Sequence, residues 1–219
     1  MLRRTHLLVA SALLCWAVAA GPAQATPLNL TLQGDPFPDI FSDFQSTSYN
    51  ATTDALSVTA FADQLRTGGT DYSIGGSGMF TLSATVNSTG VLSAGGTLTI
   101  TGTVAALSFS SGTLLTGDLM LIGFPDGTSG VLEFTFDVTG GDAASLYGGI
   151  GSTGGVIVGI ANGFPGNWTS NFSASFSGVN DVGVPMGVIP EPSGALLLAP
   201  GLAALALRRR RSVLRSLDG

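Results

Sequence analysis

The segment LEFTFDVT at residues 132–139 alternates between apolar and polar side chains without a break. Successive side chains of an extended strand point to opposite faces, so this pattern predicts a β-strand with one buried face. Similar alternation occurs at residues 28–33, 56–60, 80–87, 97–101 and 172–177. Residues 119–122 and 156–158 are apolar at every position, and we expect them to be central strands that are buried on both faces.

Turn-forming residues separate these segments. Gly95-Gly96, Asp126-Gly127 and Gly140-Gly141 supply the left-handed backbone that tight connections need. Short alternating strands with such turns are typical of antiparallel all-β proteins. The sequence therefore predicts an all-β fold, an antiparallel β-sandwich or jelly roll, formed by a single domain at residues 26–183.

Only a few segments of this domain depart from the strand pattern. We expect a single helical turn at residues 142–147 and no long amphipathic helix. Residues 35–44 are expected to form a loop, because Pro36 and Pro38 cannot donate to a sheet. From Val179 onward the chain is expected to become a flexible link, and we place the end of the domain at residue 183.

The N-terminal 25 residues have the organisation of a secretory signal peptide. Arg3 and Arg4 precede an apolar run at residues 7–20, and Ala23 and Ala25 provide the small residues of a cleavage site. We therefore expect export through the Sec translocon and a mature chain that starts at Thr26. A retained membrane helix is the alternative, but the apolar run is short for that role.

Charge is distributed very unevenly along the chain. Residues 26–188 carry twelve acidic side chains and a single basic one, Arg66, which gives this part a formal charge of −11. A surface of this sign repels nucleic acid and anionic lipid, so we expect no nucleic-acid partner.

The C-terminal region combines three features in a fixed order. Pro190, Glu191 and Pro192 precede an apolar segment at residues 193–207, and four arginines follow at 208–211. As a helix the apolar segment would be about 22 Å long, which is less than the roughly 30 Å hydrocarbon core of a bilayer. The arginine cluster favours the cytoplasmic side, so the body would lie on the opposite side of the inner membrane.

This arrangement resembles a PEP-CTERM sorting signal, and we assign residues 184–219 to a linker and that signal. Proteins with such a tail resemble substrates of exosortase, a membrane transpeptidase-like enzyme of Gram-negative bacteria. The resemblance implies recognition at Pro190, Glu191 and Pro192 and a transient transmembrane sorting helix at residues 193–207, with Arg208, Arg209, Arg210 and Arg211 at its cytoplasmic end. It further implies removal of the tail and delivery to the cell surface or to the extracellular matrix, where bacteria of this kind form exopolysaccharide and biofilm.

The supply of reactive side chains argues against an enzyme. His6 and Cys15 lie in the predicted signal peptide, and the chain has no lysine, so the mature body lacks histidine, cysteine and lysine. Nucleophilic triads, Schiff-base chemistry and histidine metal centres are therefore excluded. A carboxylate-only, glycan-active enzyme is the remaining catalytic alternative, although Glu133 and Asp137 would lie about 13 Å apart along one strand.

Two binding hypotheses remain. Asp35, Asp39 and Asp43 could ligate calcium, but their spacing is not that of a calcium loop, and a solvated acidic loop is the preferred interpretation; we expect no resident metal or cofactor. Trp168 could stack on a sugar, and the alternative that it packs against the core is favoured. The sequence therefore favours a non-catalytic surface or matrix protein associated with exopolysaccharide, with a carbohydrate-binding module as the alternative.

Overall fold

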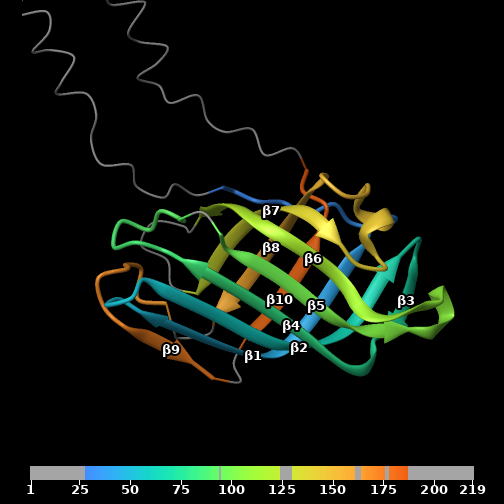
Figure 1. The fold of residues 1–219 in the computed structure, drawn as a ribbon, viewed down its shortest axis with the longest axis horizontal. Coiled ribbons are helices and arrows are strands. Elements are labelled where there is room, and N and C mark those ends of the chain that lie inside the picture. The colour runs from blue at the N-terminus through green and yellow to red at the C-terminus, as the bar shows by residue number, and fades with distance from the viewer. Residues whose placement is uncertain (1–27, 94, 124–129, 161–163, 176–177, 187–219) are drawn as a thin grey trace, which may run out of the picture. The chain divides into compact units, whose positions relative to one another are not determined.

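The structure is a computed structural model that describes residues 28–93, 95–123, 130–160, 164–175 and 178–186. Figure 1 shows that the described part is built almost entirely from strands. The strands are β1 (Asp39–Asn50), β2 (Ala55–Thr67), β3 (Thr70–Ser73), β4 (Gly75–Thr85), β5 (Thr97–Val104), β6 (Phe109–Gly123), β7 (Val131–Gly140), β8 (Thr153–Ile160), β9 (Phe172–Ala174) and β10 (Gly178–Gly183). Two short 3₁₀ turns, η1 (Ala105–Leu107) and η2 (Ala144–Tyr147), are the only helical elements among these residues.

Eight of the strands close into one antiparallel barrel. Around the barrel the order is β1, β2, β4, β5, β6, β7, β8 and β10, and β10 pairs with β1 to complete the circle. Each barrel strand thus neighbours the barrel strand that precedes it in the chain, as in an up-and-down meander. The short strands β3 and β9 extend the sheet beside β2 and β1.

The predicted all-β, antiparallel class is confirmed, whereas the predicted sandwich or jelly roll is wrong. A sandwich needs two separate sheets, but here the first and last strands pair over four residues, from Asp39 with Gly183 to Ser42 with Asn180. Closure satisfies the backbone hydrogen bonds that two open edges would otherwise expose.

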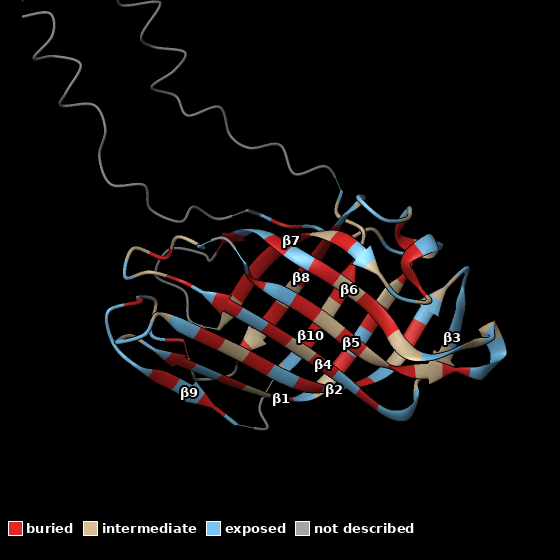
Figure 2. Cartoon of the chain, viewed as in Figure 1, coloured by how far each residue is buried: buried red, intermediate tan, exposed pale blue. Residues whose placement is uncertain are grey.

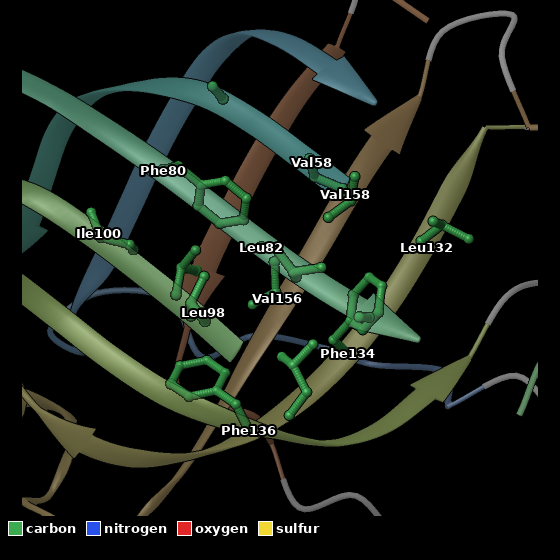
Figure 3. Packing of buried hydrophobic residues seen from close by; sticks show 14 of the residues in the cluster. Val58, Phe80, Leu82, Leu98, Ile100, Leu132, Phe134, Phe136, Val156 and Val158 are labelled. Atoms are coloured by element: carbon green, nitrogen blue, oxygen red, sulfur yellow. The ribbon is translucent and has the colours of Figure 1, made fainter. Parts of the chain in front are cut away.

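Alternating burial along the strands creates the core inside the barrel (Figure 2). Figure 3 shows aromatic and aliphatic side chains from neighbouring strands meeting there, among them Phe80, Phe134 and Phe136. Glycine makes room for the largest of them, because a Cβ atom at Gly117 or Gly154 would collide with the ring of Phe136. The barrel interior is therefore a packed core.

Strand β1 corrects the expected loop at residues 35–44. Pro36 and Pro38 precede the strand, which begins at Asp39, so neither proline removes a bond from its ladder. Strand β10 likewise occupies residues 178–183, where a flexible link was expected to begin. The predicted helical turn at residues 142–147 is confirmed by η2.

Residues 28–33 were expected to form a strand, but they lie as an irregular segment against the outside of the barrel, and Asn29 within it has φ +49°. Their only ladder contact is a bridge between Leu32 and Pro185, supported by the amide of Gln33, which donates to the carbonyl oxygen of Val184 at 2.8 Å. Gly155 of β8 makes room for this segment, because a Cβ there would contact the side chains of Leu30 and Leu32.

The predicted sorting helix at residues 193–207 lies outside the described residues. Among the residues that are described, no helix is long and apolar enough to cross a membrane.

Candidate functional site

Trp168 belongs to an aromatic cluster at the barrel end where β1 finishes. Its side chain is 2% exposed, and its ring lies 4.9 Å from Tyr49, 5.0 Å from Phe164 and 5.7 Å from Phe172. The Tyr49 hydroxyl donates to the carbonyl oxygen of Val86 at 2.8 Å, and burial together with the nearby Asp54 raises the pKa of Tyr49. The structure thus places Trp168 in the core, and its buried ring has no exposed face on which a sugar could stack.

Other aromatic side chains lie on the outside of the barrel. We define the outer apolar patch as the exposed apolar residues of β10, β1, β2 and β4: Phe41, Phe44, Phe61, Met79 and Val179. Phe61 of β2 lies directly opposite Met79 of β4 and Asp43 of β1. Val179 adjoins Asn180, which pairs with Ser42 of β1. The patch therefore crosses four adjacent strands.

A bulge in β1 gives the patch its most exposed ring. The pairing of Asp43 with Phe61 is followed by that of Ser46 with Thr59, so β1 contains one extra residue here. Within this bulge Phe44 has φ +49°, a left-handed conformation that is unusual for a bulky side chain. The Phe44 ring is 58% exposed and meets the ring of Phe61 edge to face, with 6.4 Å between their centroids.

Several carboxylate side chains lie within or beside this patch. Asp43 is half-buried within it and Asp63 is exposed on β2. Asp181 of β10, which lies opposite Phe41, hydrogen-bonds to Asp39. Burial, followed by the hydrogen bond and the charge of Asp39, raises the pKa of Asp181 to about 8.

The single arginine of the body is engaged nearby. The Arg66 guanidinium donates to the carboxylate of Asp71 at 2.6 Å, and both side chains are about half exposed. This pair lowers the pKa of Asp71 and raises that of Arg66. The positive charge is thus partly neutralised at the edge of the barrel.

The three aspartates considered for calcium do not share one loop. Asp39 and Asp43 belong to β1, and Asp39 hydrogen-bonds to Asp181. Asp35 lies before the strand, where a Cβ on Gly69 would contact its carboxylate. Within the described ranges, no three histidine, cysteine or acidic side chains gather in a group that could hold a metal ion.

Glu133 was the residue considered for a catalytic carboxylate pair, and it has a structural contact instead. Its carboxylate, which is 8% exposed on the outer side of β7, accepts the backbone amides of Leu28 at 3.0 Å and Leu30 at 3.3 Å. These bonds attach the segment at residues 28–33 to the barrel. Asp137 lies four residues further along β7, opposite Asp118 and Thr153.

A row of polar side chains faces the barrel interior from β1 and β10. Ser42, Gln45, Thr47 and Asn180 are each at most 2% exposed. The Gln45 amide donates to the Thr47 hydroxyl. Within the described residues, the Ser42 hydroxyl, the Gln45 carbonyl oxygen and both amide atoms of Asn180 have no hydrogen-bond partner. Such groups are costly to bury, so this side of the interior is less stabilising than the apolar side.

The residues predicted to direct export and sorting lie outside the described part. They are Ala23, Ala25, Pro190, Glu191, Pro192, Arg208, Arg209, Arg210 and Arg211.

The outer apolar patch was not found from the sequence. One signal for it is present, since Ile40-Phe41 and Ala60-Phe61 each place apolar residues at consecutive positions, and one of each pair must then face outward. The fold and this surface define a class: a closed, packed antiparallel barrel with an exposed aromatic patch. No family model, no curated protein and no solved structure matches the chain. These comparisons therefore do not assign the chain to a family within that class.

Proposed function

We propose that this chain is an exported, non-catalytic protein of the cell surface or extracellular matrix that associates with exopolysaccharide through the outside of its barrel. The observation that carries this proposal is the outer apolar patch, with Phe44 58% and Phe61 50% exposed. Contiguous exposed apolar surface commonly marks a site of interaction. The interior is filled by side chains, so the outside of the barrel is the surface available for binding.

The contacts that several acidic side chains make also favour a non-catalytic role. Glu133 binds two backbone amides, Asp71 pairs with Arg66, and Asp142 accepts the amide of Ser111 at 2.9 Å. Each of these carboxylates thus fixes a piece of the fold.

Export and sorting complete the proposal. The signal peptide, with Ala23 and Ala25 at its cleavage site, would take the chain through the Sec translocon. An exosortase would then act on Pro190, Glu191 and Pro192 while residues 193–207 and the arginines at 208–211 hold the chain transiently in the inner membrane. The destination is the cell surface or the matrix of a Gram-negative bacterium.

Replacing Pro190, Glu191 and Pro192 together with alanine tests this route. We expect the variant to keep its tail and to remain in the inner-membrane fraction, whereas the natural chain appears in the surface or matrix fraction. Pro165→Ala, at an exposed position of the body, is the matched control and should be sorted normally. Normal release of the triple variant would refute sorting by this signal.

A carboxylate-only, glycan-active enzyme is the second candidate, and Asp39 and Asp181 are the observation in its favour. A carboxyl group with a pKa of about 8 can serve as a general acid. The two groups hydrogen-bond to each other, however, and so lie closer than the ~5–10 Å that separates the carboxyl groups of glycoside hydrolases. Release of reducing sugar that is lost in Asp181→Asn would favour this candidate over the first.

A further inference from the structure

We infer that the outer apolar patch is the surface on which the barrel binds an uncharged polysaccharide chain. This inference rests on the proposed function and adds to it the chemistry of the ligand and the way in which the ligand lies on the patch. The chain would lie across β10, β1, β2 and β4, over Val179, Phe44, Phe61 and Met79.

The dimensions of the patch suit an extended ligand. Neighbouring strands lie about 4.8 Å apart, so the distance across four strands is roughly 14 Å. Phe61 and Met79 lie in one register row with Asp43, while Phe41 lies further along β1 beside Asp181. More than one sugar ring can therefore contact the patch at the same time.

The side-chain chemistry matches the two kinds of surface on a pyranose. One face of such a ring presents C–H groups, which pack on aromatic and aliphatic side chains, while hydroxyls project from its edge. Phe44 and Phe61 present exposed rings 6.4 Å apart for the first kind of contact. Asp43, opposite Phe61, is an acceptor for the hydroxyls.

The bulge in β1 holds the patch in a defined shape. Phe44 keeps φ +49° there, a conformation that costs free energy and persists only when the surrounding structure enforces it. The register on both sides of the bulge is set by the pairs Asp43–Phe61 and Ser46–Thr59. The Phe44 ring is therefore positioned before any ligand binds, which reduces the entropy lost on binding.

Charge distinguishes an uncharged chain from the other possible occupants. Asp43 and Asp63 lie within or beside the patch, and Arg66 is already paired with Asp71. A uronate polymer or an anionic lipid surface would meet unbalanced negative charge. A second copy joined through a two-fold axis would bring the same acidic surface against itself.

The test is affinity electrophoresis of the purified exported chain through gels containing hydroxyethylcellulose, galactomannan or polygalacturonate. We expect retardation by at least one of the two uncharged polymers and none by polygalacturonate. Phe44→Ala with Phe61→Ala should weaken that binding about tenfold or more. The matched control is Met120→Ala with Leu121→Ala, which removes the exposed apolar side chains of β6, elsewhere on the barrel, and should bind normally.

The same variants in cells separate this inference from the proposed function. The Phe44/Phe61 variant should be exported and processed normally but recovered in the medium instead of the matrix. If that variant stays in the matrix, or if neither uncharged polymer retards the natural chain, the inference is wrong while the sorting proposal stands. Retardation by polygalacturonate alone, or a dimer that dissociates in the Phe44/Phe61 variant, would overturn it as well.

Discussion

Strands β4 to β8 line one side of the barrel interior with Phe80, Phe134, Phe136 and other apolar side chains. On the opposite side, β1 and β10 add the polar side chains of Ser42, Gln45, Thr47 and Asn180 to the apolar ones of Ile40, Tyr49 and Val182. On the outer surface, apolar side chains are exposed on these same two strands. Around β1 and β10 the exposed residues include Phe41, Phe44 and Val179. We call the paired strands β1 and β10, where the barrel closes, the closing seam. Its pattern of polarity is partly inverted relative to the rest of the barrel.

This difference indicates that the two regions have different tasks. Strands β4 to β8 have apolar side chains inside and mostly polar ones outside, apart from the exposed Met79, Met120 and Leu121. This arrangement buries much apolar surface, which stabilises the fold. The closing seam contributes less to the free energy of unfolding, because it buries polar atoms and exposes aromatic rings. Regions that depart from the stabilising pattern are commonly functional, and the seam carries the proposed binding surface.

The largest expected effect is loss of packing in the apolar region. Phe136→Ala removes a fully buried ring that fills the space over Gly117 and Gly154, and we expect the free energy of unfolding to fall by about 3–5 kcal/mol. Chemical denaturation measures this. Phe44→Ala, the same change on the exposed face of the seam, should cost less than about 1 kcal/mol. Equal losses for the two variants would contradict the distinction between the regions.

The contact between Glu133 and the N-terminal segment should have an intermediate effect. Glu133→Ala leaves the amides of Leu28 and Leu30 without their acceptor, which should cost about 1–3 kcal/mol. Glu133→Gln retains one acceptor oxygen and should cost less. Denaturation of both variants, with amide hydrogen exchange at Leu28 and Leu30, measures the effect. Unchanged exchange in Glu133→Ala would show that Glu133 does not hold this segment.

The sequence predicted the apolar region better than the seam. Residues 119–122 are an exception, because they were expected to be buried on both faces, whereas Met120 and Leu121 are exposed. The strands around Phe80, Phe134 and Val156 have regular alternation or continuous apolar runs, so their local pattern agrees with their burial. In β1, by contrast, the inward positions carry Ser42 and Gln45, and the bulge interrupts the period of two. Periodicity cannot detect a strand whose polarity and spacing both depart from the rule.

Closure and the aromatic contacts are also non-local. A sandwich and a barrel bury alternate residues in the same way, so the pairing of β1 with β10 could not be deduced from either strand alone. Trp168 was correctly favoured as a core residue, but its partners Tyr49 and Phe172 come from separate segments. The outer apolar patch depends likewise on the register that joins β1, β2 and β4.

The outer side of the seam should respond to pH. The pKa of Asp181 is about 8 in the folded chain and near 4 when unfolded, so the folded state binds more protons between these values. The stabilising contribution is complete below the unfolded pKa and is lost as the pH rises through about 8. Because Asp181 is only partly buried, we expect a modest decline in stability, measured by denaturation from pH 4 to pH 9. Asp181→Asn should reduce that decline, and an unchanged slope would refute this origin.

The smallest expected effect concerns the inner side of the seam. It tests most directly whether the seam is less stabilising than the apolar region. The Ser42 hydroxyl is fully buried and has no hydrogen-bond partner among the described residues, so removing it should also remove a desolvation cost. We expect Ser42→Ala to change the free energy of unfolding by less than about 1 kcal/mol, in the direction of greater stability. Leu98→Ala, a truncation at an equally buried position in the apolar region, should instead cost about 2–5 kcal/mol. If Ser42→Ala destabilises the chain by a similar amount, the hydroxyl has a stabilising partner, and the seam is as strongly held as the apolar side of the barrel.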